Sequence, residues 1–191
     1  TFYGSSMTVA TRGGDTKINF SAANRADQIT WSKGLKDPEH TVIIDASTLK
    51  AKNGKVPEGR HPGHHTSDGA PLVVVTSPLY LPNPTDGYGR PVETFIAGVN
   101  DDEESLIRAL EQGRNVFSAS SCSTNAIMTL LHIVKLTGLP LEEVVIHINH
   151  AKTESDSALN AFSVARSSSG SQKELARLLP TIGMDTSALD L

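Results

Sequence analysis

Residues 115–136 have the sequence NVFSASSCSTNAIMTLLHIVKL, and this stretch decides the fold. Its first four residues predict a short strand. From Ser123 to Leu136, apolar residues then recur at the spacing of one helix face. These residues are Ile127, Leu130, Leu131 and Val134. Cys122 is therefore predicted to lie at the amino terminus of a helix that directly follows a strand.

Three stretches upstream of this one predict buried strands. Thr41 to Asp45, Leu72 to Thr76 and Thr94 to Val99 are dominated by β-branched, other apolar or aromatic residues. Because strands joined by crossover connections pair in parallel, the sequence predicts an α/β fold with a parallel sheet. A shorter alternating stretch runs from Lys17 to Phe20.

Further helices and one further strand are expected around this sheet. Asp101 to Gly113, with acidic residues in its first turn, and Ser171 to Leu179 predict helices. Lys50 to Gly69 is rich in Gly, Pro, Lys and His, and it predicts a loop with room for one short helix. Val144 to Asn149 alternates apolar and polar residues and predicts a strand with His150 at its end.

Length and composition limit the class of protein. A chain of 191 residues can form one domain or parts of two, and 38% hydrophobic with 20% charged residues is typical of a soluble globular protein. A formal net charge of -4 gives no reason to expect a nucleic acid or an anionic membrane as partner. The lone cysteine excludes an intrachain disulfide, so we expect a reducing cytoplasm. Without an initiator Met or a signal-peptide pattern, we expect the chain to begin inside a longer reading frame.

Cys122 is the candidate nucleophile. The backbone N–H groups and the dipole at a helix amino terminus favour the thiolate over the thiol. Its neighbours are small and polar, which suits an anion better than an apolar core. These neighbours are Ser120, Ser121, Ser123, Thr124 and Asn125. The alternative, that Cys122 is a small buried apolar residue, stays open from the residues alone.

Histidines supply the other candidate functional groups. His150 follows Cys122 after one predicted helix and one predicted strand, and its imidazole could act as a base toward the thiol or pair with a thiolate. A plain structural role at the end of the strand is equally compatible with the sequence. His61, His64 and His65 form a cluster, but a Pro-Gly pair interrupts it and no cysteine accompanies it. We therefore expect no metal site there.

Two segments resemble motifs of one enzyme family. Residues 118–125, SASSCSTN, resemble the nucleophile motif Ser-Asn-Ala-Ser-Cys-Thr-Thr-Asn of the phosphorylating glyceraldehyde-3-phosphate dehydrogenases. Residues 150–153, HAKT, resemble the family's His-Ala-Tyr-Thr, at nearly the family's separation. Further matches follow in family order and extend the resemblance over nearly the whole chain. They are residues 25–31, 42–47, 65–70, 73–78, 98–100 and 168–173, the last followed by Leu179-Pro180.

The resemblance implies two partial domains. It implies the latter part of a Rossmann-like NAD-binding domain over residues 1–121, joined to the start of an α+β catalytic domain over residues 122–191. No Gly-x-Gly-x-x-Gly turn, and no following acidic residue for the adenosine ribose, occurs in the sequence. The family's substrate-binding Arg and C-terminal helix have no counterpart either. We expect such a fragment alone to bind NAD poorly and to be inactive.

The activity that the resemblance implies is NAD-dependent oxidative phosphorylation of a phosphorylated aldehyde, of the glyceraldehyde 3-phosphate type. A thioester would form on Cys122, with His150 as the base. The implied phosphate-binding and substrate-binding residues are Ser121, Ser123, Thr153, Ser169 and Gly170, and the implied cofactor contacts are Ser47 and Thr76. The implied assembly is a cytoplasmic homotetramer, and NADP in place of NAD stays open.

Two other functions stay open at this point. Erythrose-4-phosphate dehydrogenase shares the Cys and the His and differs mainly in substrate. A non-catalytic relative could instead be an interaction or redox-sensing module, in which the Cys122 thiol is oxidised and not acylated. Substrate and cofactor preference stay undecided because Ser123 stands in place of the family's Thr, and Ala126 in place of its second Cys.

Overall fold

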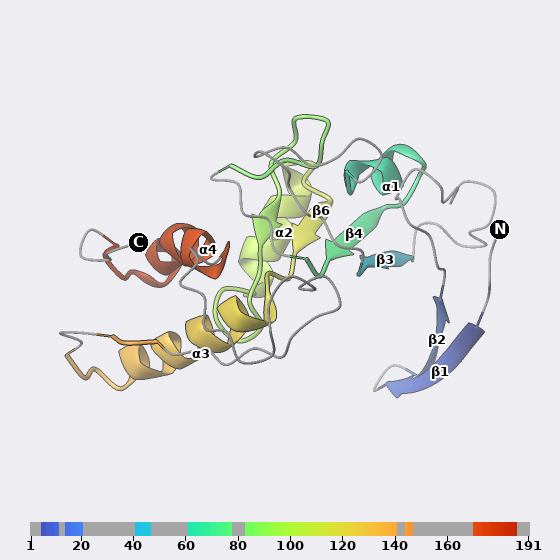
Figure 1. Ribbon diagram of the computed structural model, residues 1–191. Helices are drawn as coiled ribbons and strands as arrows, with labels where there is room; N and C mark the ends of the chain where they lie inside the picture. The colour runs from blue at the N-terminus through green and yellow to red at the C-terminus, as the bar shows by residue number, and fades with distance from the viewer. Residues whose placement is uncertain are drawn as a thin grey trace, which may run out of the picture.

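The predicted parallel sheet forms the centre of the structure. The computed structural model describes residues 5–11, 14–20, 41–46, 61–77, 83–140, 144–146 and 170–186. Within these residues four parallel strands pair in the order β3-β4-β6-β5 (Figure 1). The strands are β3 (Val42–Asp45), β4 (Leu72–Val75), β5 (Glu93–Thr94) and β6 (Val116–Ser118). A parallel sheet with helices is consistent with an α/β, Rossmann-like fold.

Apolar side chains cover one face of this sheet. Successive side chains of a strand point to opposite faces, and on β3 this leaves Val42 and Ile44 exposed while the alternate residues are buried. The strand β6 is buried along its whole length because it has a neighbour on each side. The buried cluster comprises Ile43, Ala70, Val73, Val75, Val92 and Val116.

Four α-helices accompany the described sheet. They are α1 (Gly63–Ser67), α2 (Glu103–Glu111), α3 (Cys122–Leu136) and α4 (Gly170–Leu178), and the last continues into the 3-10 helix η4 (Leu179–Ile182). The α2 helix begins where the Asp102 carboxylate accepts a hydrogen bond from the Ser105 N–H at 2.9 Å. Hydrogen bonds from the backbone and the side chain of Ser105 hold the pKa of Asp102 below its usual value.

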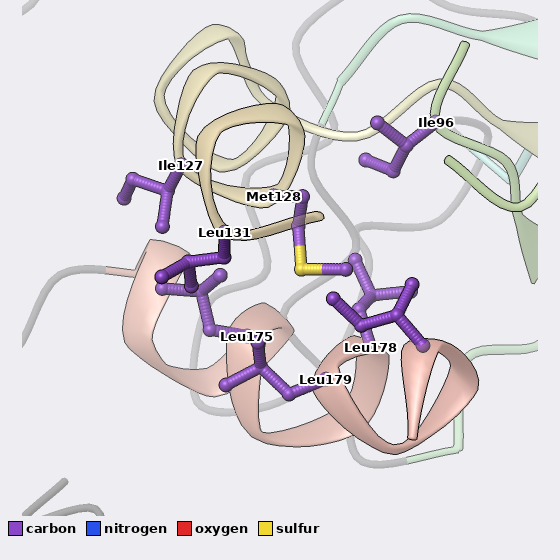
Figure 2. Packing of buried hydrophobic residues seen from close by; sticks show 8 residues of the cluster. Ile96, Ile127, Met128, Leu131, Leu175, Leu178 and Leu179 are labelled. Atoms are coloured by element: carbon purple, nitrogen blue, oxygen red, sulfur yellow. The ribbon is translucent and has the colours of Figure 1, made fainter. Parts of the chain in front are cut away.

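The helices α3 and α4 share a second apolar core. Figure 2 shows Ile127, Met128 and Leu131 of α3 facing Leu175 and Leu178 of α4. The same cluster takes in Ile96, Leu179 and Ile182. Met128 is fully buried within this cluster. Its flexible thioether chain can fill an irregular gap between the two helices. This core fixes α4 beside the helix that begins at Cys122.

The strand predicted from Thr94 to Val99 is wrong for most of its residues. Instead of Thr94 to Val99, β5 contains only Glu93–Thr94, and residues 97–100 form a turn. The Asn100 side chain explains the difference, because its Oδ1 accepts the Ile96 N–H at 2.7 Å and its Nδ2 donates to the Thr94 carbonyl at 3.0 Å. These two bonds close a turn that Gly98 completes with a φ of 73°.

Two other strand expectations also differ from the structure. The predicted strand from Val144 to Asn149 does not appear in residues 144–146, its described part, whose three apolar side chains are all exposed. Near the other end, the alternating stretch Lys17 to Phe20 belongs to a longer antiparallel hairpin. The hairpin pairs β1 (Ser5–Thr11) with β2 (Gly14–Phe20).

The remaining elements agree with the sequence expectations. The strands expected over 41–45 and 72–76 are β3 and β4, and the helices expected over 101–113, 123–136 and 171–179 are α2, α3 and α4. The expectation that the first strand is buried is correct for only one face of β3, because Val42 and Ile44 on the other face are exposed. The helix α1 lies in the segment for which a loop with one short helix was predicted. In the described part of the chain, no helix is long and apolar enough to cross a membrane. The domain boundary at residue 121 stays a prediction.

Replacing Met128 with Ala should lower the free energy of unfolding by about 2 to 5 kcal/mol, because it leaves a cavity between α3 and α4. Leu130 is a matched control on the same helix, since its side chain is 64% exposed. Leu130→Ala should change the free energy of unfolding by no more than about 0.5 kcal/mol. Urea unfolding followed by circular dichroism measures both values. Equal losses for the two variants would contradict the packed core at Met128.

Candidate functional site

The carboxyl ends of three neighbouring parallel strands meet at one edge of the sheet. The Thr76 N–H, just after β4, donates to the Asp45 carbonyl of β3 at 3.0 Å. The Ala119 N–H, just after β6, donates to the Val75 carbonyl at 2.8 Å. The segments that follow β4 and β6 therefore start side by side. Ligands of open α/β sheets bind at this edge.

A strained turn leads from β6 into α3. Ser120 has a φ of 64°, and among the described residues it is the only non-glycine residue with a positive φ. This conformation costs an L residue with a side chain on the order of 1 kcal/mol. The Ser120 N–H donates to Ser118 Oγ at 3.0 Å, and Asn125 Nδ2 donates to the carbonyls of Ala119 and Ser121 at 2.6 and 2.9 Å. Side chains on both sides of the turn thus hold its backbone.

Cys122 is the first residue of α3 and is exposed. Ser121 caps the helix, because its Oγ accepts the Thr124 N–H at 3.1 Å. At the amino terminus of any helix the backbone N–H groups point outward, and the helix dipole adds positive potential at the same end. Both effects favour a thiolate at Cys122.

A buried carboxylate lies beneath this turn. Glu174 of α4 is 0% exposed, and its Oε2 accepts hydrogen bonds from Ser120 Oγ at 2.8 Å and Thr124 Oγ1 at 2.9 Å. Thr124 Oγ1 also lies 2.8 Å from Ser121 Oγ, which is 3.4 Å from Ser171 Oγ. We call Ser120, Ser121, Thr124, Ser171 and Glu174 the Glu174 network.

Arg177 extends this polar region toward β5. Its Nη2 lies 4.0 Å from Glu174 Oε1 and donates to Thr94 Oγ1 at 2.8 Å. Burial lowers the pKa of the Arg177 guanidinium, and the attraction of Glu174 opposes that change. The buried Arg177 Nε has no hydrogen-bond partner among the described residues. Within the described residues, the guanidinium therefore uses only part of its hydrogen-bonding capacity.

The clustered histidines bind different partners. His65 Nε2 lies 3.1 Å from Asp45 Oδ2, and both residues are buried, so this pair fastens α1 to the end of β3. His64 Nδ1 instead lies 2.9 Å from the Tyr88 hydroxyl. Among the residues that the structure describes, no three His, Cys, Asp or Glu side chains could hold a metal ion together.

The structure describes about half of the site residues that the sequence suggested. Cys122, Ser121 and Ser123 lie in the cap and first turn of α3, and Thr76 is exposed at the neighbouring strand end. Gly170 begins α4, one residue before Ser171, so the starts of α3 and α4 are brought together. The other predicted site residues lie outside the described part of the chain. They are Ser47, His150, Thr153 and Ser169.

Sequence reasoning missed Glu174, Arg177 and the conformation of Ser120. A signal for Glu174 was present, because it shares the helical spacing of the buried residues Ser171, Leu175 and Leu178. A carboxylate among such residues has to find donors in the core. No comparable signal marks Ser120, whose positive φ depends on contacts with distant residues.

Comparison with known proteins yields a distant similarity. Glyceraldehyde-3-phosphate dehydrogenase of Treponema pallidum (strain Nichols) is 23% identical to this chain over 140 residues, which are 73% of this chain and 34% of that enzyme. The chain thus spans about a third of the length of this relative. No family model matches, and no solved structure matches. Together with the parallel sheet, the similarity supports at most a distant relationship to glyceraldehyde-3-phosphate dehydrogenase and suggests a dehydrogenase-type protein.

Proposed function

We propose that this chain is part of an enzyme that oxidises a phosphorylated aldehyde and transfers the acyl group to phosphate, with Cys122 as the nucleophile. The observation that carries the proposal is an exposed cysteine at the amino terminus of α3, where the carboxyl ends of parallel strands meet. The distant similarity to a glyceraldehyde-3-phosphate dehydrogenase supports the same reaction class. The proposed substrate is an aldehyde of the glyceraldehyde 3-phosphate type.

The proposed chemistry has two halves, oxidation of the aldehyde to a thioester and transfer of the acyl group to phosphate. The Cys122 thiolate attacks the aldehyde carbon and forms a thiohemiacetal, whose hydroxyl proton passes to the His150 imidazole. The backbone N–H groups at the start of α3 stabilise the developing oxyanion. Loss of a hydride from the former aldehyde carbon, for which NAD would supply the acceptor when it is bound, then leaves a thioester on Cys122. Inorganic phosphate then attacks the resulting thioester, the C–S bond breaks, and an acyl phosphate leaves while the thiolate is regenerated.

The starts of α3 and α4 are the proposed site for the attacking phosphate. Two helix amino termini that lie side by side present several N–H groups to one anion. The Ser121 hydroxyl already caps α3, so the binding groups there would be backbone N–H groups and the Ser123 hydroxyl. Ser169 and Gly170 would contribute from α4, and Thr153 would hold the phosphate of the substrate.

The polar groups at the sheet edge fit one end of NAD. Thr76 is an exposed hydroxyl beside the strained turn, and with Ser47 it would contact the nicotinamide half. The pyrophosphate and the adenosine ribose need a glycine-rich turn and an acidic residue that the 191 residues do not contain. The donor set therefore suits the nicotinamide half of the cofactor and not the adenosine half. A homotetrameric assembly stays a proposal from the family resemblance.

An activated Cys122 should react with iodoacetamide at a pH below that at which an ordinary thiol reacts. We expect the alkylation rate of the folded chain to reach half its plateau clearly below pH 8.5, the pKa of an unperturbed cysteine. Stopped-flow or mass-spectrometric kinetics across a pH series would measure this midpoint. The urea-unfolded chain is the control. Equal midpoints for folded and unfolded chain would refute activation by the helix.

Acyl transfer can be tested without the cofactor, because the phosphate step is reversible. Acetyl phosphate should transfer its acetyl group to the Cys122 thiolate and release inorganic phosphate, with no change in oxidation state. Mass spectrometry of the intact chain should show one acetyl group, which hydroxylamine removes from a thioester. Cys122→Ser should stay unmodified under the same conditions. A thiol that hydrogen peroxide oxidises readily but acetyl phosphate never acylates would favour a redox role instead.

We expect the chain alone to bind NAD with a dissociation constant of about 1 mM or weaker. Several charge-assisted hydrogen bonds to the pyrophosphate and ribose, each worth roughly 1.5 to 3 kcal/mol, have no partner in this sequence. Calorimetric titration to millimolar NAD measures the affinity, with a dehydrogenase that contains the glycine-rich turn as the control. Micromolar binding by the chain itself would mean that the adenosine half has a site that the sequence does not suggest.

A further inference from the structure

We propose that Glu174 is a positioning residue, which holds Cys122 in its reactive place by fastening the turn before it and the first turn of α3 to α4. The inference rests on the proposed role of Cys122 as the nucleophile. Neither the family resemblance nor the relative assigns a role to this residue. The argument starts from the burial of its carboxylate, which is complete.

The contacts of Glu174 fix the direction of each hydrogen bond in the Glu174 network. An ionised carboxylate can only accept, so the Ser120 and Thr124 hydroxyls must both donate to its Oε2. With its proton committed, Thr124 Oγ1 can only accept from the Ser121 hydroxyl, 2.8 Å away. The Ser121 oxygen is then left to accept the Thr124 N–H, as the helix cap requires.

The same contacts stabilise the strained turn. The Ser120 hydroxyl reaches Glu174 across 54 positions of the sequence while its own backbone has a φ of 64°. A residue held in the left-handed region keeps that conformation only where surrounding contacts favour it. Because Cys122 lies two residues further on, a turn that relaxed would displace the thiol from the N–H groups of the helix start.

The surroundings of Glu174 explain why its charge is tolerated. Two hydroxyls bind one oxygen, and the Arg177 guanidinium lies 4.0 Å from the other. Arg177 comes from α4 itself, and the two hydroxyls come from the β6 to α3 turn and from α3. Hydrogen bonds are directional, so the two bonds to Oε2 restrict the orientation of the turn and of α3 relative to α4 in a way that apolar contacts do not.

Variants of Glu174 separate its contacts from its charge. Both hydroxyls bind the same oxygen, so Glu174→Gln can keep both contacts through its amide oxygen while it loses the charge. Glu174→Ala loses the charge and both contacts. Ser120→Ala removes one contact and leaves the carboxylate in place. Glu104, an exposed carboxylate of α2 paired with Arg108, gives the matched control Glu104→Ala.

The readout is the pH profile of Cys122 alkylation in the full 191-residue chain, with the unfolding free energy measured in parallel. We expect Glu174→Ala to slow alkylation at pH 7 by about 2- to 10-fold, the factor that corresponds to a lost hydrogen bond, and to move the thiol midpoint upward. Glu174→Gln should stay close to the original profile. Ser120→Ala should change in the same direction as Glu174→Ala, and it decides the question if Glu174→Ala does not fold.

Three results would overturn the proposal. The first is lower stability with an unchanged pH profile, which marks a merely structural residue. The second is a Glu174→Gln profile like that of Glu174→Ala. The third is faster alkylation in both, which means that the charge opposes the thiolate and the contacts do not matter. If the original chain itself has an ordinary thiol midpoint, the proposed function fails, whereas Glu174 is still tested by the differences in rate.

Discussion

A buried carboxylate must have hydrogen-bond donors, and this requirement connects the parts of the protein that surround Cys122. Glu174 lies on the face of α4 that also carries Leu175 and Leu178, so the apolar packing of α4 against α3 carries the carboxylate into the interior. The donors come from Ser120 and Thr124. Apolar packing thus supplies the free energy that brings the two helices together, and the carboxylate selects the orientation in which both hydroxyls reach it.

The parallel sheet determines where this arrangement lies. Since β3, β4 and β6 run in the same direction, their carboxyl ends share one edge, and the chain must turn sharply there to enter α3. The bond from the Ala119 N–H to the Val75 carbonyl extends the strand pairing by one residue, and the left-handed Ser120 then redirects the chain. The exposed position of Cys122 follows from the length of β6 and from this single residue.

Local patterns predicted the elements whose stability is local. The apolar spacing in α3 and the β-branched runs in β3 and β4 were sufficient, because such patterns favour a helix or a strand without help from distant residues. The strand expected after Thr94 failed because Asn100 competes for its backbone groups. The Glu174 network was not predictable in the same way, since Ser120 and Glu174 are 54 positions apart and only the tertiary packing brings them together. Local patterns therefore suggested Cys122 and His150, motif resemblance suggested the other site residues, and only the structure shows the residues that support them.

The negative charge of Glu174 has two opposite effects on Cys122, because it repels a thiolate while its hydrogen bonds orient the turn before the thiol. A negative charge near the start of α3 opposes a second negative charge on the Cys122 sulfur, and on this ground alone a neutral residue would serve a thiolate better. Hydrogen bonds from two hydroxyls and the nearby positive charge of Arg177 stabilise the carboxylate charge, so its repulsion of the thiolate is reduced. The directional contacts keep their full effect on Ser120 and on the cap. The proposed positioning role of Glu174 therefore requires that orientation be the stronger of the two effects.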